Sequence, residues 1–150
     1  MRTAAASLAL LLCACSPAPI PHEDVNAFVT LYIARTNARD TGKAMTMIEK
    51  SKDVTSITGA KITHGWDAIR EAADRNARQA NPGKVALGSM EVFTLGPDTA
   101  LASGPMRIGG GPFKIGDRTV DELGGAYTIV VKRTPDGLRI IHEHFSIRAL

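Results

Sequence analysis

The residues of this sequence whose types and spacing best suit chemistry lie near its end, where one residue separates His142 from His144. Positions two apart on a β-strand lie on the same face of a sheet. An imidazole gains or loses its charge near neutral pH, so it can serve as a general base or as a metal ligand. A zinc site needs a further ligand, which His64 or His22 would supply only if the fold brought it near. We therefore predict no metal site and no bound cofactor.

The histidines are predicted to lie on the second strand of a β-hairpin. Two β-rich runs flank the turn at residues 134–137, Thr-Pro-Asp-Gly, in which proline fixes φ and glycine tolerates a positive φ. If Arg133 pairs with Leu138 across this turn, strict alternation decides which residues share a face. Tyr127 then lies opposite His144 on the more apolar face, which we expect to turn toward the helices.

Two interpretations of this face remain open. In the functional interpretation, Tyr127, His142 and His144 form the polar end of a cavity, and one imidazole acts as a general base. In the structural one, the histidines are hydrogen-bonded groups of a sheet face or of a dimer interface. The opposite face is apolar enough for us to expect a homodimer. Its residues would be Ala126, Thr128, Val130, Ile141, Phe145 and Ile147.

Three helices are predicted before most of the strands. Residues 22–39 carry apolar residues at helical spacing, and Tyr32 is one of them. A short second helix follows Asp40, whose side chain can cap it. A third begins near Trp66, with Asp67 as its cap. Trp66 either closes the mouth of a cavity or fixes this helix to the core.

The remaining segments read as strands. One strand is expected at 54–57, and two longer ones, 85–95 and 99–108, flank a turn at 96–98 and form a hairpin. A glycine-rich loop is expected at 109–123. Helices followed by strands indicate an α+β fold, in which the helices cover one face of a curved antiparallel sheet. Such a cone leaves a cavity between the two layers.

The first residues resemble a targeting signal. A short apolar run ends at residues 12–15, Leu-Cys-Ala-Cys, which resemble a bacterial lipobox, where the last cysteine receives the lipid. Processing there would remove residues 1–14 as the signal peptide and leave Cys15 as the lipidated first residue. The alternative is an ordinary secreted protein with an unmodified cysteine.

On the lipoprotein interpretation, the mature chain has two parts. Residues 15–21 hold the lipidated cysteine and a stiff, proline-rich tether, and residues 22–150 form a single domain. Ser16 follows the cysteine, which resembles lipoproteins sent to an outer membrane. We expect a periplasm-facing protein of the cell envelope, held to the membrane by its lipid, with the outer membrane favoured over the inner one.

The composition excludes several functions. The sequence has 2 cysteines. With Cys13 removed and Cys15 lipidated, the domain would have no thiol for a disulfide, a metal or a nucleophile. The net charge is +3, basic residues are dispersed, and aromatic residues make up 5% of the chain. A nucleic-acid surface needs a basic stripe, often with stacking rings, so we expect no nucleic-acid partner.

Two stretches of the sequence resemble a known family. They are residues 65–70, Gly-Trp-Asp-Ala-Ile-Arg, and residues 136–146, Asp-Gly-Leu-Arg-Ile-Ile-His-Glu-His-Phe-Ser. They are similar to the SnoaL-like branch of the nuclear transport factor 2 superfamily, which often has a Gly-x-x-Ala-Ile start and a terminal Trp-x-Ile-x-His-x-His-x-Ser strand. Leu138 stands where the tryptophan is common. The resemblance covers residues 22–147 and implies the cone-shaped fold of this family, which hosts many unrelated activities.

Ketosteroid isomerase has this fold and uses an aspartate base with a tyrosine and a protonated aspartate as donors. The resemblance implies that Tyr32 could take the place of the tyrosine. The base position falls near Ser56 and the acid donor near residues 128–130, and neither place has a carboxylate. The resemblance therefore does not transmit that activity.

We predict a membrane-anchored lipoprotein whose SnoaL-like domain binds a small apolar or amphipathic ligand, or a protein partner, without catalysis. One alternative is an isomerase, cyclase or hydrolase with a cavity histidine as general base. Another is a structural accessory subunit that dimerises through its sheet. The candidate ligand-binding residues are Tyr32, Trp66, Tyr127, His142 and His144.

Overall fold

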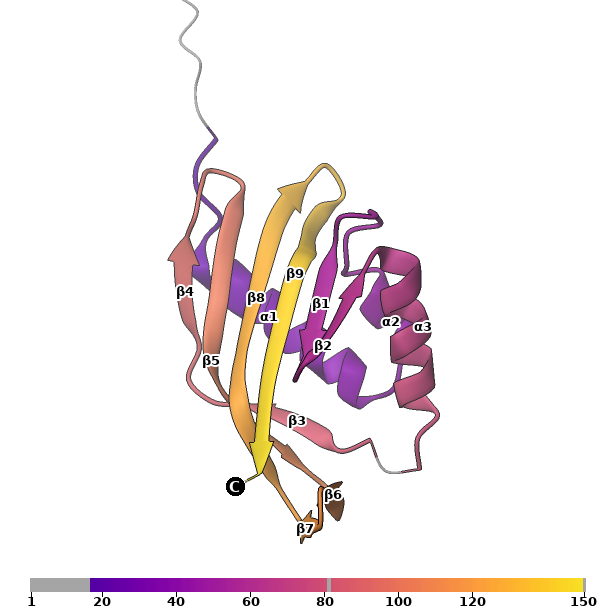
Figure 1. The fold of residues 1–150 in the computed structure, drawn as a ribbon. Helices are drawn as coiled ribbons and strands as arrows, with labels where there is room; N and C mark the ends of the chain where they lie inside the picture. Colours follow the sequence, from indigo (N-terminus) through magenta and orange to yellow (C-terminus); the bar gives the residue numbers. More distant parts are fainter. Residues whose placement is uncertain (1–16, 81, 150) are drawn as a thin grey trace, which may run out of the picture.

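The computed structural model describes residues 17–80 and 82–149 and consists of helices packed on one face of a curved sheet (Figure 1). This arrangement confirms the predicted α+β class. In chain order the elements are α1 (His22–Asn37), α2 (Thr41–Met45), β1 (Thr55–Thr58), β2 (Lys61–His64), α3 (Trp66–Ala77), β3 (Lys84–Leu87), β4 (Glu91–Thr94), β5 (Thr99–Gly109), β6 (Phe113–Ile115), β7 (Arg118–Val120), β8 (Leu123–Thr134) and β9 (Gly137–Ala149).

The main sheet has the strand order β2-β1-β9-β8-β5-β3, and β4 also pairs with β5. Strand β1 runs parallel to β9, whereas the other pairs of this sheet are antiparallel. The sheet is therefore mixed, and the prediction of a purely antiparallel sheet is wrong in this detail. The reason is that β1 and β9 come from distant parts of the chain, so no hairpin turn sets their relative direction.

Several strand boundaries differ from the prediction. The run over 85–95 is divided into β3 and β4, which both pair with β5. The division falls at Gly88, whose N–H donates to the carbonyl of Pro105 and where a Cβ would come within 2.8 Å of the proline ring. The loop expected at 109–123 contains the small hairpin β6–β7. Strand β2 extends the predicted strand at 54–57 into a hairpin.

Helix α1 ends in a tight turn that leads directly into α2. The N–H of Arg39 donates to the carbonyl of Thr36, and that of Asp40 donates to the carbonyl of Arg35. This is the Schellman pattern, and Arg39 occupies its left-handed position with φ 58°. The side chain of Asp40 accepts from the N–H of Lys43 at 3.1 Å, which confirms Asp40 as the cap of α2.

Helix α3 begins differently. It follows Gly65, which has φ 83° and supplies no side-chain cap. The prediction that Asp67 caps this helix is wrong, because Asp67 lies within the first helical turn. A carboxylate in the first turn still interacts favourably with the helix dipole.

The core fills the space between the helices and the inner face of the sheet, and the segment before α1 contributes to it. Ile20 is only 2% exposed, and the guanidinium of Arg133 donates to the carbonyl of Ala18 at 2.9 Å. Residues 18–20 therefore pack on the domain, near the end of the sheet where β8 turns into β9. The largest fully buried side chains are Tyr127, Ile129, Ile140, Val25, Val29, Val54 and Val131.

The final hairpin pairs as predicted near its turn and differs further along. Arg133 lies opposite Leu138. Strand β9 then contains a bulge, in which Ile141 has no partner on β8, whereas its neighbours Ile140 and His142 pair with consecutive residues of β8. A bulge of this kind shifts the alternation of side chains by one residue.

The bulge decides which residues of β9 face the helices. Ile140 and Glu143 are buried on the inner face, and Tyr127 pairs with Phe145. The prediction that His142 and His144 line this face is therefore wrong. Strict alternation would have placed them there, but it does not hold across the bulge.

The face of the sheet away from the helices, here called the outer face, changes accordingly. Phe145 and Ile147 pack against the core, so their predicted position on the outer face is wrong for the same reason. Thr128 and Val130 lie on the outer face as predicted, where they pair with His144 and His142.

Candidate functional site

A buried carboxyl group connects three elements of the inner face. Glu143 on β9 is the only charged residue that is buried in the described part of the chain, at 6% exposure. The hydroxyl of Tyr32 on α1 donates to one of its oxygens at 2.7 Å, and the hydroxyl of Ser56 on β1 donates to the other at 2.7 Å. Both oxygens therefore have a donor, which makes the burial of this group tolerable.

Burial dominates the electrostatics of this group. It raises the pKa of Glu143, and the hydrogen bonds from Ser56 and Tyr32 offset only part of that rise. The pKa of Tyr32 is raised well above its ordinary value by burial and by the charge and hydrogen bond of Glu143. These hydroxyls act as donors to the carboxyl group. Neither pocket described below includes Glu143 in its lining.

Tyr127 lies on the same inner face and differs from Tyr32 in one respect. It is 1% exposed, and its hydroxyl has no hydrogen-bond partner among the described residues. Burial raises the pKa of Tyr127. Gly104 on β5 makes room for the ring, because a Cβ there would lie 3.1 Å from the hydroxyl oxygen.

The two histidines of β9 lie on the outer face, within a row of directly paired residues. Thr55 of β1 pairs with both His142 and His64, and its hydroxyl lies 3.2 Å from Nδ1 of His64. Burial, followed by the charge of His144, lowers the pKa of His142. No group of metal-binding side chains occurs among the residues that the structure describes.

Trp66 fixes α3 to its neighbours. Its indole N–H donates to the carbonyl of Met45, the last residue of α2, at 3.2 Å. Lys50 and Arg70 each place a cationic group 5.4 Å from the ring centroid. These contacts match the second of the predicted roles for this residue, which is attachment of the helix to the core.

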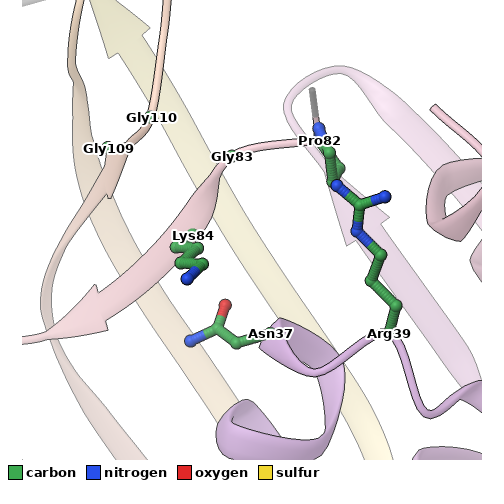
Figure 2. A pocket seen from close by; sticks show the side chains of 7 residues that line it. All are labelled: Asn37, Arg39, Pro82, Gly83, Lys84, Gly109 and Gly110. Carbon is green, nitrogen blue, oxygen red and sulfur yellow. The ribbon is translucent and has the colours of Figure 1, made fainter. Parts of the chain in front are cut away.

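A pocket of about 150 Å³ lies at the end of α1, and we call it the basic pocket (Figure 2). It is formed where the end of α1, the start of β3 and the end of β5 meet. Figure 2 shows the side chain of Lys84 directed toward Asn37 and that of Arg39 reaching toward Pro82. The lining residues are Asn37, Arg39, Pro82, Gly83, Lys84, Gly109 and Gly110.

Asn37 forms a rigid wall of the basic pocket. Its side-chain N–H donates to the carbonyl of Val85 at 2.8 Å, and its side-chain oxygen accepts from the N–H of Val85 at 2.9 Å. This pair of bonds attaches the last residue of α1 to the edge strand β3. The basic pocket could not be recognised in the sequence, because its residues come from three separate segments that share no motif.

A second, more open pocket of about 410 Å³ lies between the start of α1 and β4. The ring of His22 lies 3.4 Å from the hydroxyl of Thr94 beside it. The lining residues are His22, Glu23, Asn26, Ala27, Met90 and Val92.

Neither pocket includes any of the predicted ligand-binding residues. Cys15, the predicted lipidation site, and the predicted signal peptide 1–14 lie outside the described residues.

No protein-family model and no curated protein matches this sequence. Solved structures do match the fold. A nuclear transport factor 2-like protein of unknown function from Shewanella oneidensis has 20% identity and a TM-score of 0.66, over 85% of this chain and 99% of that one. A superfamily member from Salmonella enterica has 17% identity and a TM-score of 0.71, over 85% and 91%. An uncharacterized cystatin-like fold protein from Caulobacter vibrioides has 18% identity and a TM-score of 0.71, over 84% and 88%.

Proposed function

We propose that this chain, which has the nuclear transport factor 2-like fold, binds a small ligand in the basic pocket without catalysis and is anchored to the bacterial envelope by a lipid at Cys15. One observation carries the binding proposal. The basic pocket is a concave site between three elements, and hydrogen-bond donors of Arg39 and Lys84 line it. Concave sites with a few convergent polar groups are where small molecules bind.

The lack of a carboxylate or an imidazole among the residues that line the basic pocket supports a non-catalytic role. A general base must lie within hydrogen-bond reach of its substrate. The lining of the basic pocket contains no carboxylate and no imidazole. Glu143 is buried with both oxygens engaged, and His142 and His144 lie on the outer face.

A catalytic alternative depends on Glu143. A carboxyl group with a raised pKa beside a tyrosine hydroxyl is typical of functional sites, and Glu143 with Tyr32 has this arrangement. The alternative requires an opening that brings substrate to this group. It would use Glu143 as the general acid or base, in place of the histidine that the sequence suggested.

The anchor is supported by the lipobox-like residues 12–15. No helix in the described part of the chain is long and apolar enough to cross a membrane. Ala18 is held on the domain by Arg133, and the step from Cys15 to Ala18 spans at most about 11 Å of extended chain. A lipid at Cys15 would therefore keep this end of the domain close to the bilayer.

A ligand screen tests the binding proposal. The full chain, purified in detergent from the expressing bacterium, is mixed with a small-molecule library and bound compounds are identified by mass spectrometry. We expect compounds whose binding is lost in Lys84→Gln and retained in Glu143→Gln. Binding that is lost only in Glu143→Gln would favour the catalytic alternative.

A separate measurement tests the anchor. Mass spectrometry of the chain from a Gram-negative host should find a lipid on Cys15, and Cys15→Ser should accumulate as unprocessed precursor. A soluble mature form that begins downstream of Cys15 in wild-type cells would contradict the anchor and leave the binding proposal intact.

A further inference from the structure

The charge of the basic pocket is unbalanced. Its lining contributes the guanidinium of Arg39 and the ammonium of Lys84, and the other lining residues are neutral. The two cations come from different elements, the turn after α1 and strand β3, and both are exposed. A ligand can therefore reach them without a rearrangement of the fold.

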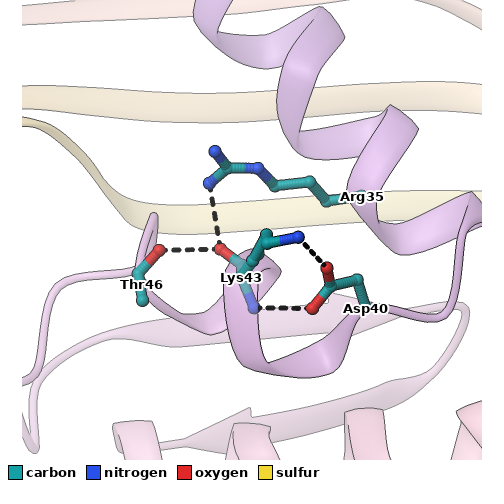
Figure 3. A network of polar contacts seen from close by, with 4 residues as sticks. All are labelled: Arg35, Asp40, Lys43 and Thr46. Atoms are coloured by element: carbon teal, nitrogen blue, oxygen red, sulfur yellow. Dashed lines mark hydrogen bonds and ion pairs between the residues drawn. The ribbon is translucent and has the colours of Figure 1, made fainter.

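The nearby charged residues are already engaged with one another (Figure 3). Asp40 accepts from the backbone of Lys43 at 3.1 Å and forms an ion pair with its ammonium at 2.9 Å. Arg35 donates to the carbonyl of Lys43 at 3.1 Å. In contrast, the side chains of Arg39 and Lys84 take part in no hydrogen bond or ion pair within residues 17–80 and 82–149.

The backbone of Arg39 has a conformation that residues with a Cβ rarely adopt. Its φ of 58° is in the left-handed region, which glycine adopts much more readily than a residue with a Cβ. The corresponding position of a Schellman turn is usually glycine. A residue with a Cβ is therefore less favourable here than glycine, and the cation of Arg39 also lies near the end of α1, where the helix dipole favours a positive charge.

The backbone around the two cations is well fixed. The side-chain amide of Asn37 donates one hydrogen bond to the backbone of Val85 and accepts another from it. Gly83 packs so closely that a Cβ would lie 2.6 Å from Ile108 and 2.9 Å from Phe113. A backbone that is already fixed loses little further conformational freedom when a ligand binds.

We propose that the basic pocket binds a small oxyanion, a phosphate or carboxylate group, between Arg39 and Lys84. This inference rests on the proposed function and names its ligand class. A guanidinium offers paired donors that match the oxygens of such a group, and an ammonium adds a second charge. The pocket volume of about 150 Å³ corresponds to roughly five water molecules, which suits one such group.

Calorimetry with the full chain in neutral detergent tests this inference at constant ionic strength. The probes are inorganic phosphate, succinate, vesicles of phosphatidylglycerol and, as a neutral control, glycerol. We expect saturable binding of phosphate or succinate. Arg39→Gly and Lys84→Gln should each weaken it by about tenfold or more, because each removes a charged donor. Binding only of the vesicles, lost in both variants, would support the oxyanion site and identify a lipid headgroup as the source of the oxyanion.

The controls separate binding from folding. Lys43→Gln removes a nearby cation that is already paired with Asp40 and should leave the affinity unchanged. Arg39→Gly places glycine at a left-handed position, so its melting temperature should equal or exceed that of the wild type. No binding of any anion by the wild type, or wild-type affinity in both Arg39→Gly and Lys84→Gln, overturns the inference. If a neutral compound from the screen still binds the pocket, the proposed function survives that outcome.

Discussion

At the scale of single residues, the burial of Glu143 depends on its two hydroxyl donors. An unpaired carboxyl group in the core would be strongly destabilising, whereas here each oxygen accepts a bond of 2.7 Å. Its raised pKa means that the folded state binds a proton more readily than the unfolded chain does. This burial could not be predicted from the sequence, because Glu143 lies between two histidines on a strand where strict alternation places it on the outer face.

The first prediction concerns pH. A folded-state pKa above the ordinary value of 4.5 gives stability that is fully present below that value and is lost as the pH rises through the folded pKa. Urea unfolding of the wild type should therefore show a falling free energy of unfolding over this range. Glu143→Gln cannot ionise and should show a smaller fall. Identical pH profiles for the two proteins would contradict the assignment.

The second prediction compares the two buried tyrosines. Tyr32→Phe removes the donor to one oxygen of Glu143 and should lower the free energy of unfolding by roughly 1–3 kcal/mol. Tyr127→Phe removes a hydroxyl without a partner among the described residues and should be neutral or stabilising. Chemical denaturation measures both. Equal destabilisation by the two substitutions would show that the bond to Glu143 is not what matters.

At the scale of elements, local signals were recoverable from the sequence and irregular pairing was not. The turn after Arg133 and the cap at Asp40 depend on neighbouring residues, and both predictions are confirmed. The bulge at Ile141 depends on how β9 fits β8 and leaves no mark in the sequence. Because of this bulge, His142 and His144 lie on the outer face and not on the inner face where the site was predicted. The basic pocket was missed for a similar reason, since only the fold brings its three segments together.

The third prediction uses the bulge. Deletion of Ile141 removes a residue without a partner on β8, so the pairing on both sides can remain and Glu143 should stay buried. Deletion of Thr128, which pairs with both Ser103 and His144, must shift one part of β8 against its neighbours. Circular dichroism should find a cooperative melt for the first variant only. The reverse result would show that the bulge is required for folding.

At the scale of the whole molecule, the outer face remains a candidate dimer surface, although its composition differs from the prediction. On this face, Phe93 of β4 is 49% exposed and Ile62 of β2 is 57% exposed. Half-buried apolar residues such as Val130 lie on the strands between β2 and β4. We propose that a second copy of the chain covers this face, because such a contact would remove these exposed apolar side chains from water.

The fourth prediction tests this dimer. Sedimentation of the full chain in detergent at micromolar concentrations should detect a dimer. Val130→Lys, near the centre of the outer face, should shift it to monomer by placing a charge in the interface. Leu31→Lys changes an exposed residue of α1 and should leave the dimer intact. A wild-type monomer across the concentration range contradicts the proposal.

The two ends of the molecule would then have different roles. Residues 18–20 and Arg133 lie at one end of the sheet, beside the start of β5, whereas the basic pocket lies at the other end of β5 (Figure 1). An anchor at Cys15 would place the pocket on the side of the domain away from the membrane. A ligand could then reach the pocket from the periplasm.

The central claim is that ligand binds in the basic pocket and not beside Glu143 or the histidines of the outer face. Crystals of the full chain soaked in tungstate, an oxyanion with a strong anomalous signal, test it most directly. We predict an anomalous peak between Arg39 and Lys84 that disappears in Arg39→Gly crystals. A peak beside His142 and His144, or none at the basic pocket, would contradict the account.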